Sequence, residues 1–382
     1  ALESDVLSAN LLADAIRSEL ERRRYELETL ASDGELRQLV VDYATKPLSE
    51  RAPLERKLEQ MWKKNDDHLE EFNRVHDASW FLLDSSGIER WRHPTSPTPD
   101  KDFRRRDFFH GGKFDYGEDD NLDDCRAIRD WYISKPFKSE TSKFYVVALA
   151  VPIKDPLDGE KVTGVLCRTL TLGTLIKDYQ QSWSRKEADG VDRKLAIVDG
   201  GHVDGKYTWQ LLAHSWMDNA KLERISQADF QKLRLDVVVD EEVTRDLEQL
   251  MRLSVKKGED LATAEAEFDR TEHYIDPVRQ IDPDTYGGEW LAAFGRIGNT
   301  EWIAVVQERK DAALRPVEQL HARMMTSAFG GVLVVFALVA GAWWLNVALV
   351  NDRNPRLPGF WRGRSNATGS TMSLSTKQND SA

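Results

Sequence analysis

The chain opens with apolar side chains at alternating spacings of four and three, the pattern of one face of an α-helix. Gly34 follows this stretch as a predicted C-cap, and Arg23 stands where the next apolar residue should fall. The stripe predicts either a helix that packs on its own domain or the seam of a dimer. Its members are Leu2, Val6, Ala9, Ala13, Ile16, Leu20, Leu27 and Leu30.

A second helical pattern runs from about Pro53 to Val75, after which the period shortens to that of strands. Ser79 to Asp84 and Ile88 to Arg92 flank Gly87, which predicts a tight hairpin. A longer hairpin follows, formed by Lys143 to Ile153 and Val162 to Leu172. Leu195 to Asp199 then begins a second set of the same kind, which Glu289 to Gly295 and Glu301 to Gln307 close, so the architecture repeats. Residues 217 to 270 are charged, and we expect a mostly helical insertion.

One segment is apolar enough to cross a membrane. Ala328 to Val350 carries no charged residue over 23 positions, and Trp343 and Trp344 suit a membrane interface. Four arginines follow the helix and four basic residues precede it, so the positive-inside rule barely discriminates. We expect the polar tail, 351–382, to be disordered and cytoplasmic, and the large acidic domain to lie outside.

Composition excludes several functions. The 53 Lys and Arg against 65 Asp and Glu give a formal net charge of -12, which opposes nucleic-acid binding. The two cysteines, Cys125 and Cys167, are expected to be free thiols, although one bridge stays open. No catalytic motif, metal site or cofactor motif is present, and the acidic run from Glu118 to Asp124 does not favour calcium.

The order of these motifs carries a resemblance. The hairpin W-x-L-L-D-x-x-G, the stretch KDFRRRDFF, the strands ISKPF, YVVALAVPI and VTGVLCRTLTLGTL, and the ending NTEWIAVVQERKDAALRPVEQL resemble a double Cache sensor. The resemblance implies an α+β fold, with a long N-terminal helix and two PAS-like antiparallel-sheet modules in tandem, followed by one transmembrane helix. The implied division is a sensor over 1–322, with helices in 1–75, a membrane-distal module in 76–185 and a membrane-proximal module in 186–316, then a transmembrane helix over 324–350.

The resemblance also suggests a ligand site. Amino-acid-binding members carry a stretch of the form Y-D-P-R-x-R-P-W-Y, and KDFRRRDFF occupies its place. Arg106 falls on the carboxylate-binding arginine, and Phe108 and Phe109 fall on the aromatic pair. Lys101 replaces the leading tyrosine, whereas Arg104 and Arg105 are expected to face solvent.

Two positions depart from the amino-acid-binding pattern. Thr169 stands where an aspartate would capture an amino group, and Ser139, behind Phe137, stands where a second acid is expected. An ammonium would have no counter-charge there, so a carboxylate or similar anion without an amine is the expected ligand. The nearby Arg129-Asp130-Trp131-Tyr132 spells R-x-W-Y but comes too late in the chain, and we expect it to serve packing.

These features predict an extracytoplasmic small-molecule sensor in the inner membrane, working as a homodimer. The residues themselves contain no enzyme, and the resemblance implies an effector, such as a serine/threonine kinase, before residue 1. A partner-binding ectodomain with a degenerate pocket is the alternative, and an extracytoplasmic hydrolase is the weakest.

Overall fold

The computed structural model divides the chain into two units, residues 1–315 and 316–382. It describes residues 2–71, 77–96, 98–112, 114–139, 145–171, 176–177, 179–180, 193–203, 206–207, 209–217, 225–234, 241–253 and 269–350. Part of the expected helical insertion at 217 to 270, and the tail at 351–382, therefore lie outside the described residues.

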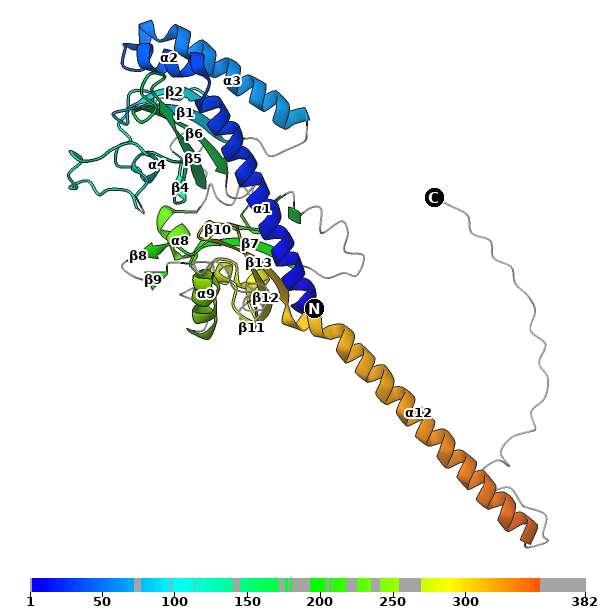
Figure 1. Ribbon diagram of the computed structural model, residues 1–382. Helices are drawn as coiled ribbons and strands as arrows, with labels where there is room; N and C mark the ends of the chain where they lie inside the picture. Colours follow the sequence, from blue (N-terminus) through cyan, green and yellow to red (C-terminus); the bar gives the residue numbers. More distant parts are fainter. Residues whose placement is uncertain are drawn as a thin grey trace, which may run out of the picture. The chain divides into compact units, whose positions relative to one another are not determined.

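Two antiparallel sheets form the first unit (Figure 1). The first sheet has the strand order β2-β1-β6-β5-β3, with β4 also paired to β5, and the second has the order β10-β7-β13-β12-β11. The two orders are equivalent. In the first sheet β1 lies between β2 and β6, and in the second sheet β7 lies between β10 and β13 in the same way. The predicted repeat is therefore confirmed.

The strands have the following bounds. The first sheet comprises β1 (Ser79–Asp84), β2 (Glu89–His93), β3 (Tyr132–Ile133), β4 (Phe137–Lys138), β5 (Tyr145–Lys154) and β6 (Val162–Thr171). The second comprises β7 (Arg193–Asp199), β10 (Gln210–His214), β11 (Arg270–Tyr274), β12 (Trp290–Arg296) and β13 (Trp302–Arg309). A two-stranded ribbon adds β8 (His202–Val203) and β9 (Lys206–Tyr207).

The helices have the following bounds. They are α1 (Leu2–Ala31), α2 (Gly34–Tyr43), η1 (Leu48–Glu50), α3 (Ala52–Glu71), α4 (Asp107–His110), α8 (Gln227–Lys232), α9 (Glu241–Leu253), η3 (Pro277–Gln280), α11 (Pro283–Tyr286) and α12 (Lys310–Val350). The α+β class predicted from the sequence is confirmed.

The prediction for Gly34 was wrong. This glycine does not end α1; it begins α2, a helix that the sequence pattern did not reveal. The reason is local, because the Asp33 side chain accepts a hydrogen bond of 2.8 Å from the Leu36 backbone N–H and so caps a new helix.

The α1 helix packs its apolar stripe on both sheets of its own domain. Ala9, Ala13, Ile16, Leu20 and Leu27 are all buried, which favours the first of the two interpretations of the stripe. Arg23 does not interrupt it; the side chain is 1% exposed and forms ion pairs described below.

The predicted dimer seam therefore faces the chain's own sheets, and a homodimer stays a prediction. The outward face of α1 carries a different apolar set. Leu7, Leu11 and Tyr25 are exposed there.

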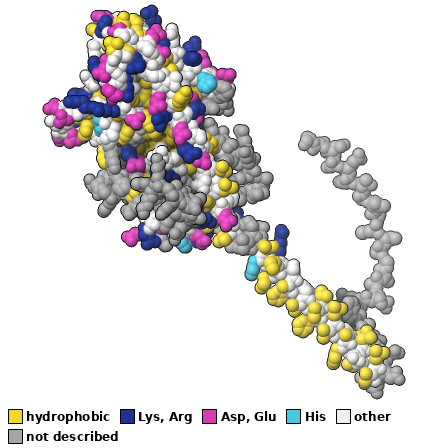
Figure 2. Space-filling model, in the orientation of Figure 1, with side chains coloured by type: hydrophobic (Ala, Val, Ile, Leu, Met, Phe, Trp, Pro, Cys, Tyr) yellow, Lys and Arg dark blue, Asp and Glu magenta, His cyan; other side chains and the backbone are white. Residues whose placement is uncertain are grey.

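A single described helix is long and apolar enough to cross a membrane, over Arg323–Val350. None of its most apolar 18-residue window is buried, in contrast to the core helix of a soluble protein. Figure 2 shows hydrophobic side chains along this part of α12. Phe329, Phe336 and Trp343 are among the exposed ones.

The contact between α1 and β12 is close enough to test. A Cβ at Gly295 would lie 2.5 Å from the Ala9 carbonyl oxygen, a backbone atom that cannot rotate away. We expect Gly295→Ala to lower the free energy of unfolding by about 1–3 kcal/mol, measured by urea denaturation.

Gly34→Ala is the matched control, since nothing lies within 4 Å of its Cβ position and alanine is the better helix former. Its stability should be unchanged or slightly higher. Equal stability of Gly295→Ala and the wild type would contradict the close packing of α1.

Candidate functional site

Side chains of β6 alternate between the two faces of the first sheet. Arg168 points to the helices, where it pairs with Glu26 of α1, while Cys167 belongs to an apolar cluster on the opposite face. Thr169, two residues after Cys167, shares that opposite face. The cluster comprises Phe81, Leu83, Phe108, Phe109, Ile128, Ala148, Ala150, Val165 and Cys167.

The short helix α4 brings most of the predicted site to this face. Phe108 and Phe109 are each 1% exposed inside the cluster. Gly111 ends the helix with a φ of 69°, and the Asp107 backbone N–H donates to Asp115 at 2.9 Å. The two aromatic side chains are thus packed within the apolar cluster, and hydrogen bonds to the backbone hold the loop around them.

Arg106 lies at the edge of the cluster, on an aromatic platform. Its guanidinium carbon is 4.3 Å from the ring centre of Phe137 and 5.4 Å from that of Phe108. Its Nε is 3.2 Å from a carboxylate oxygen of Asp115, whose side chain is 46% exposed. Arg106 is therefore stacked and half-buried, and its ion pair is screened by solvent.

The other two arginines of the run are held by local partners. Arg104 forms a bidentate pair with Asp102, with its Nη2 2.7 Å from Asp102 Oδ2, and Arg105 donates to the Gly117 carbonyl. Both lie outside the apolar cluster.

Lys101 and Ser139 are positioned by the strands β2 and β4, not by α4. Lys101 is exposed, and its backbone carbonyl accepts from the Glu89 N–H at 3.0 Å, so it extends the edge of β2. Ser139 is buried directly after β4, at 6% exposure.

Thr169 belongs to a buried polar chain that the sequence did not reveal. Its hydroxyl lies 2.9 Å from that of Ser79, which accepts a hydrogen bond of 3.1 Å from Arg92. Arg92 stacks on Phe81 at 4.5 Å and pairs with Glu89 at 2.6 Å. The position where an acid would capture an amine is therefore linked to a guanidinium.

Strand alternation was the signal that could have found Arg92. It lies opposite Phe81 in the β1–β2 pairing, so both side chains share one face. Without the register of strand pairing, one cannot predict from the sequence which face of the sheet the Arg92 side chain occupies.

Asp107 is the most perturbed carboxyl of the site. It is 1% exposed, and burial raises its pKa from 3.8 to about 7, an effect that the hydrogen bond from the Lys135 backbone N–H partly offsets. That hydrogen bond is 2.6 Å long.

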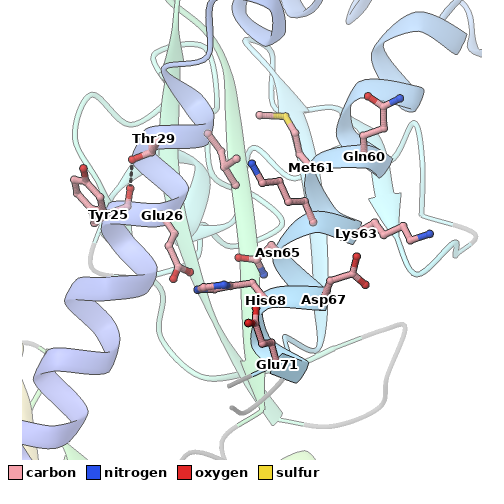
Figure 3. A pocket seen from close by; sticks show the side chains of 12 residues that line it. Tyr25, Glu26, Thr29, Gln60, Met61, Lys63, Asn65, Asp67, His68 and Glu71 are labelled. Carbon is pink, nitrogen blue, oxygen red and sulfur yellow. Dashed lines mark hydrogen bonds between the residues drawn. The ribbon is translucent and has the colours of Figure 1, made fainter. Parts of the chain in front are cut away.

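A groove of about 720 Å³ lies on the helical side of the first sheet, between α1 and α3 (Figure 3). Its walls include Tyr25, Leu30 and Met61, and Figure 3 shows His68 of α3 pointing toward Glu26 of α1. Because Glu26 also pairs with Arg168, this groove is separated from the Arg106 platform by the sheet.

The late R-x-W-Y stretch serves packing in part. Trp131 lies beneath Arg24 of α1, with 4.7 Å between the guanidinium carbon and the ring centre, and Tyr132 donates to the Gly112 carbonyl at 2.7 Å. Cys125 and Cys167 are free thiols, as predicted. Among the described residues, no group of three His, Cys, Asp or Glu side chains is placed to hold a metal ion.

No family model and no curated protein matches the chain. Solved structures do. The ligand-binding domain of the Pseudomonas aeruginosa PAO1 amino acid chemoreceptor PctB in complex with L-Arg is 17% identical, with a TM-score of 0.44, over 79% of this chain and 92% of that chain. The corresponding domain of PctC in complex with GABA is 17% identical, with a TM-score of 0.43, over 78% and 95%.

The extracellular domain of a histidine kinase, mmHK1S-Z3, is 11% identical, with a TM-score of 0.44, over 83% of this chain and 97% of that chain. Since the TM-scores are below 0.5, the proposals below depend on contacts within this chain.

The raised pKa of Asp107 predicts a pH dependence of stability. The folded state binds this proton up to about pH 7 and the unfolded state only to about pH 4, so stability falls as pH rises through that window, by about 4 kcal/mol at most. Asp107→Asn should remove this loss, as seen by urea denaturation from pH 4 to pH 8.

Asp102→Asn is the control. Burial alone would raise the pKa of Asp102, but hydrogen bonds from Arg104 outweigh it and lower the pKa, so its contribution is small and opposite in sign. If the stability of Asp107→Asn followed that of the wild type at every pH, Asp107 would not be the group responsible.

Proposed function

We propose that the chain is an extracytoplasmic sensor of a small anionic molecule, bound on the Arg106 face of the first sheet. The observation that carries the proposal is the placement of Arg106 over two aromatic rings, with Asp115, half exposed, as its nearby carboxylate. A planar guanidinium on an aromatic platform suits a carboxylate held by two parallel hydrogen bonds.

The polar chain behind the platform supports an anion over an amine. Thr169 and Ser79 contribute hydroxyl groups, and the charged group linked to them is Arg92, paired with Glu89. Among the described residues, an ammonium at this place would meet a guanidinium and no free carboxylate, which is costly in a buried site. A carboxylate or similar anion would instead be attracted by the guanidinium.

One observation favours a second function. Phe108 and Phe109 are packed against Phe81 and Cys167, so side chains of the chain itself fill much of this face. A face filled in this way also suits a partner-binding ectodomain whose pocket has degenerated.

Membrane attachment completes the proposal. We place the helix Arg323–Val350 across the inner membrane, with the sensor outside and the tail inside, and we propose a homodimer. The outward face of α1, with Leu7, Leu11 and Tyr25, is the face of that helix left for a second copy.

Ligand binding tests the sensor. The full chain in detergent micelles is screened by thermal shift against two- to six-carbon carboxylates, each paired with its 2-amino derivative. We expect at least one carboxylate to raise Tm more than its amino derivative. Arg106→Gln should weaken its binding at least 30-fold, from the typical cost of about 2 to 5 kcal/mol for breaking such a pair.

Arg104→Gln is the matched control, because this arginine has its own partner, Asp102, and should leave binding unchanged. Equal affinity in the wild type and Arg106→Gln would remove Arg106 from the site. No shift across the whole panel would favour the partner-binding function.

Topology is tested separately. Protease added to intact spheroplasts should degrade the domain formed by residues 1–315 and leave the tail after Val350 intact, as followed with an epitope at each end. A protected domain with a digested tail would reverse the proposed orientation.

A further inference from the structure

A second polar cluster lies where the two modules meet. Lys135 follows β3 of the first sheet, and its Nζ is 2.8 Å from Asp199 Oδ2 and 3.3 Å from Glu301 Oε2. Asp199 ends β7 and Glu301 precedes β13, so both acids belong to the second sheet. The ion pairs of this cluster therefore link the two modules.

The charges of this cluster do not balance. One ammonium, from Lys135, faces two carboxylates, and a third carboxyl, Asp107, accepts from the Lys135 backbone N–H at 2.6 Å. Asp107 in turn lies beside Asp115 and Arg106, which already face each other. The groups around Lys135 thus carry an excess of negative charge.

One carboxylate oxygen also lacks a donor. Asp199 is 2% exposed, and its Oδ1 has no hydrogen-bond partner among the residues that the structure describes. Burial raises the pKa of Asp199, although the nearby Lys135 ammonium opposes this rise. A buried carboxylate oxygen left without a hydrogen-bond donor is unfavourable, so a further cation or donor would stabilise the cluster.

A cavity of about 370 Å³ opens at this cluster and is suited to such a group. Asp199 and Glu301 line it together with the aromatic residues Trp131, Tyr132 and Trp302. Aromatic faces beside carboxylates are the usual surroundings of an organic ammonium ion, which gains cation–π contact and charge-assisted hydrogen bonds. The volume lies at the lower end of the range for small-molecule sites.

We propose that this cavity between the modules binds a small organic cation bearing a primary ammonium group, which shares Asp199 and Glu301 with Lys135. The site is distinct from the Arg106 face and takes ligands of opposite charge. Because Lys135 belongs to one module and both acids to the other, the bound cation competes with the ion pairs between the modules. Its binding therefore changes the strength of the contact between the two modules.

The test uses 2-phenylethylammonium as the probe and 2-phenylethanol, which lacks the charge, as its control. Titration calorimetry on the full chain in micelles at pH 8 should show binding of the ammonium only. Asp199→Asn should weaken that binding about tenfold or more. Lys135→Met removes the competing cation and should strengthen binding about tenfold, a result that a merely structural role would not produce.

Four further measurements keep the outcome clear. Glu301→Gln, at a more exposed position, should weaken binding even if Asp199→Asn fails to fold, and Glu160→Gln, at an exposed turn, should change nothing. Arg106→Gln should also leave the ammonium bound, which separates this site from the proposed anion site. Binding should weaken as the pH is lowered from 8, because burial raises the pKa of Asp199 and a protonated Asp199 no longer attracts a cation.

Equal binding of the alcohol, or a loss of ammonium binding in Lys135→Met, would overturn the proposal. The proposal would also be overturned if no ammonium bound at any pH. If protein stability still changed with pH in that case, the cluster would be only a proton-sensitive contact between the modules.

Discussion

The buried ion cluster around Asp77 holds α1 against the first sheet, and the rest of the first module depends on it. Asp77 pairs with Arg23 of α1 and, at 2.7 Å, with Arg168 of β6, and both arginines are at most 1% exposed. Trp80 donates to the same carboxylate at 2.7 Å. Removing one member of such a buried pair typically costs about 3–5 kcal/mol, so these charges fix the position of α1 on β6.

That constraint links the two faces of the sheet. Arg168 faces α1, and the next residue, Thr169, faces the Arg106 side, so one short segment of β6 contributes to both the helix contact and the proposed ligand face. The same helix reaches the second sheet, where Gly295 lies against the Ala9 backbone. A ligand that favours one position of β6 over another would thereby change the energy of the α1 contact, which is the requirement for signalling.

Charge is distributed unevenly within an acidic chain. The Arg106 face gathers guanidinium groups beside aromatic rings, whereas the cavity between the modules gathers carboxyl groups around a single lysine. Asp199 is buried, which strengthens its electrostatic interactions, whereas the Arg106 ion pair is partly exposed. The two arrangements suit the two proposed ligands of opposite charge, within a chain whose formal net charge is -12.

The elements whose signals are local could be predicted from the sequence alone. Strand alternation, the Gly87 turn, the long apolar helix and the repeat of two sheets were all predictable, because each depends on neighbouring residues. Within the site, Phe108 and Phe109 were expected beside Arg106 only from the resemblance to the Y-D-P-R-x-R-P-W-Y stretch. Local signals were not enough to predict α2, where capping by Asp33 outweighed the glycine signal.

Which side chains meet across the sheets could be known only from the three-dimensional fold. Arg23 looked like a break in the apolar stripe until the fold supplied Asp77 as its ion-pair partner, and Arg92 joined the site through the pairing of β1 with β2. Lys135, Asp199 and Glu301 lie far apart in the chain and meet only where the modules pack. Such contacts depend on strand register and module docking, which spacing along the sequence does not encode.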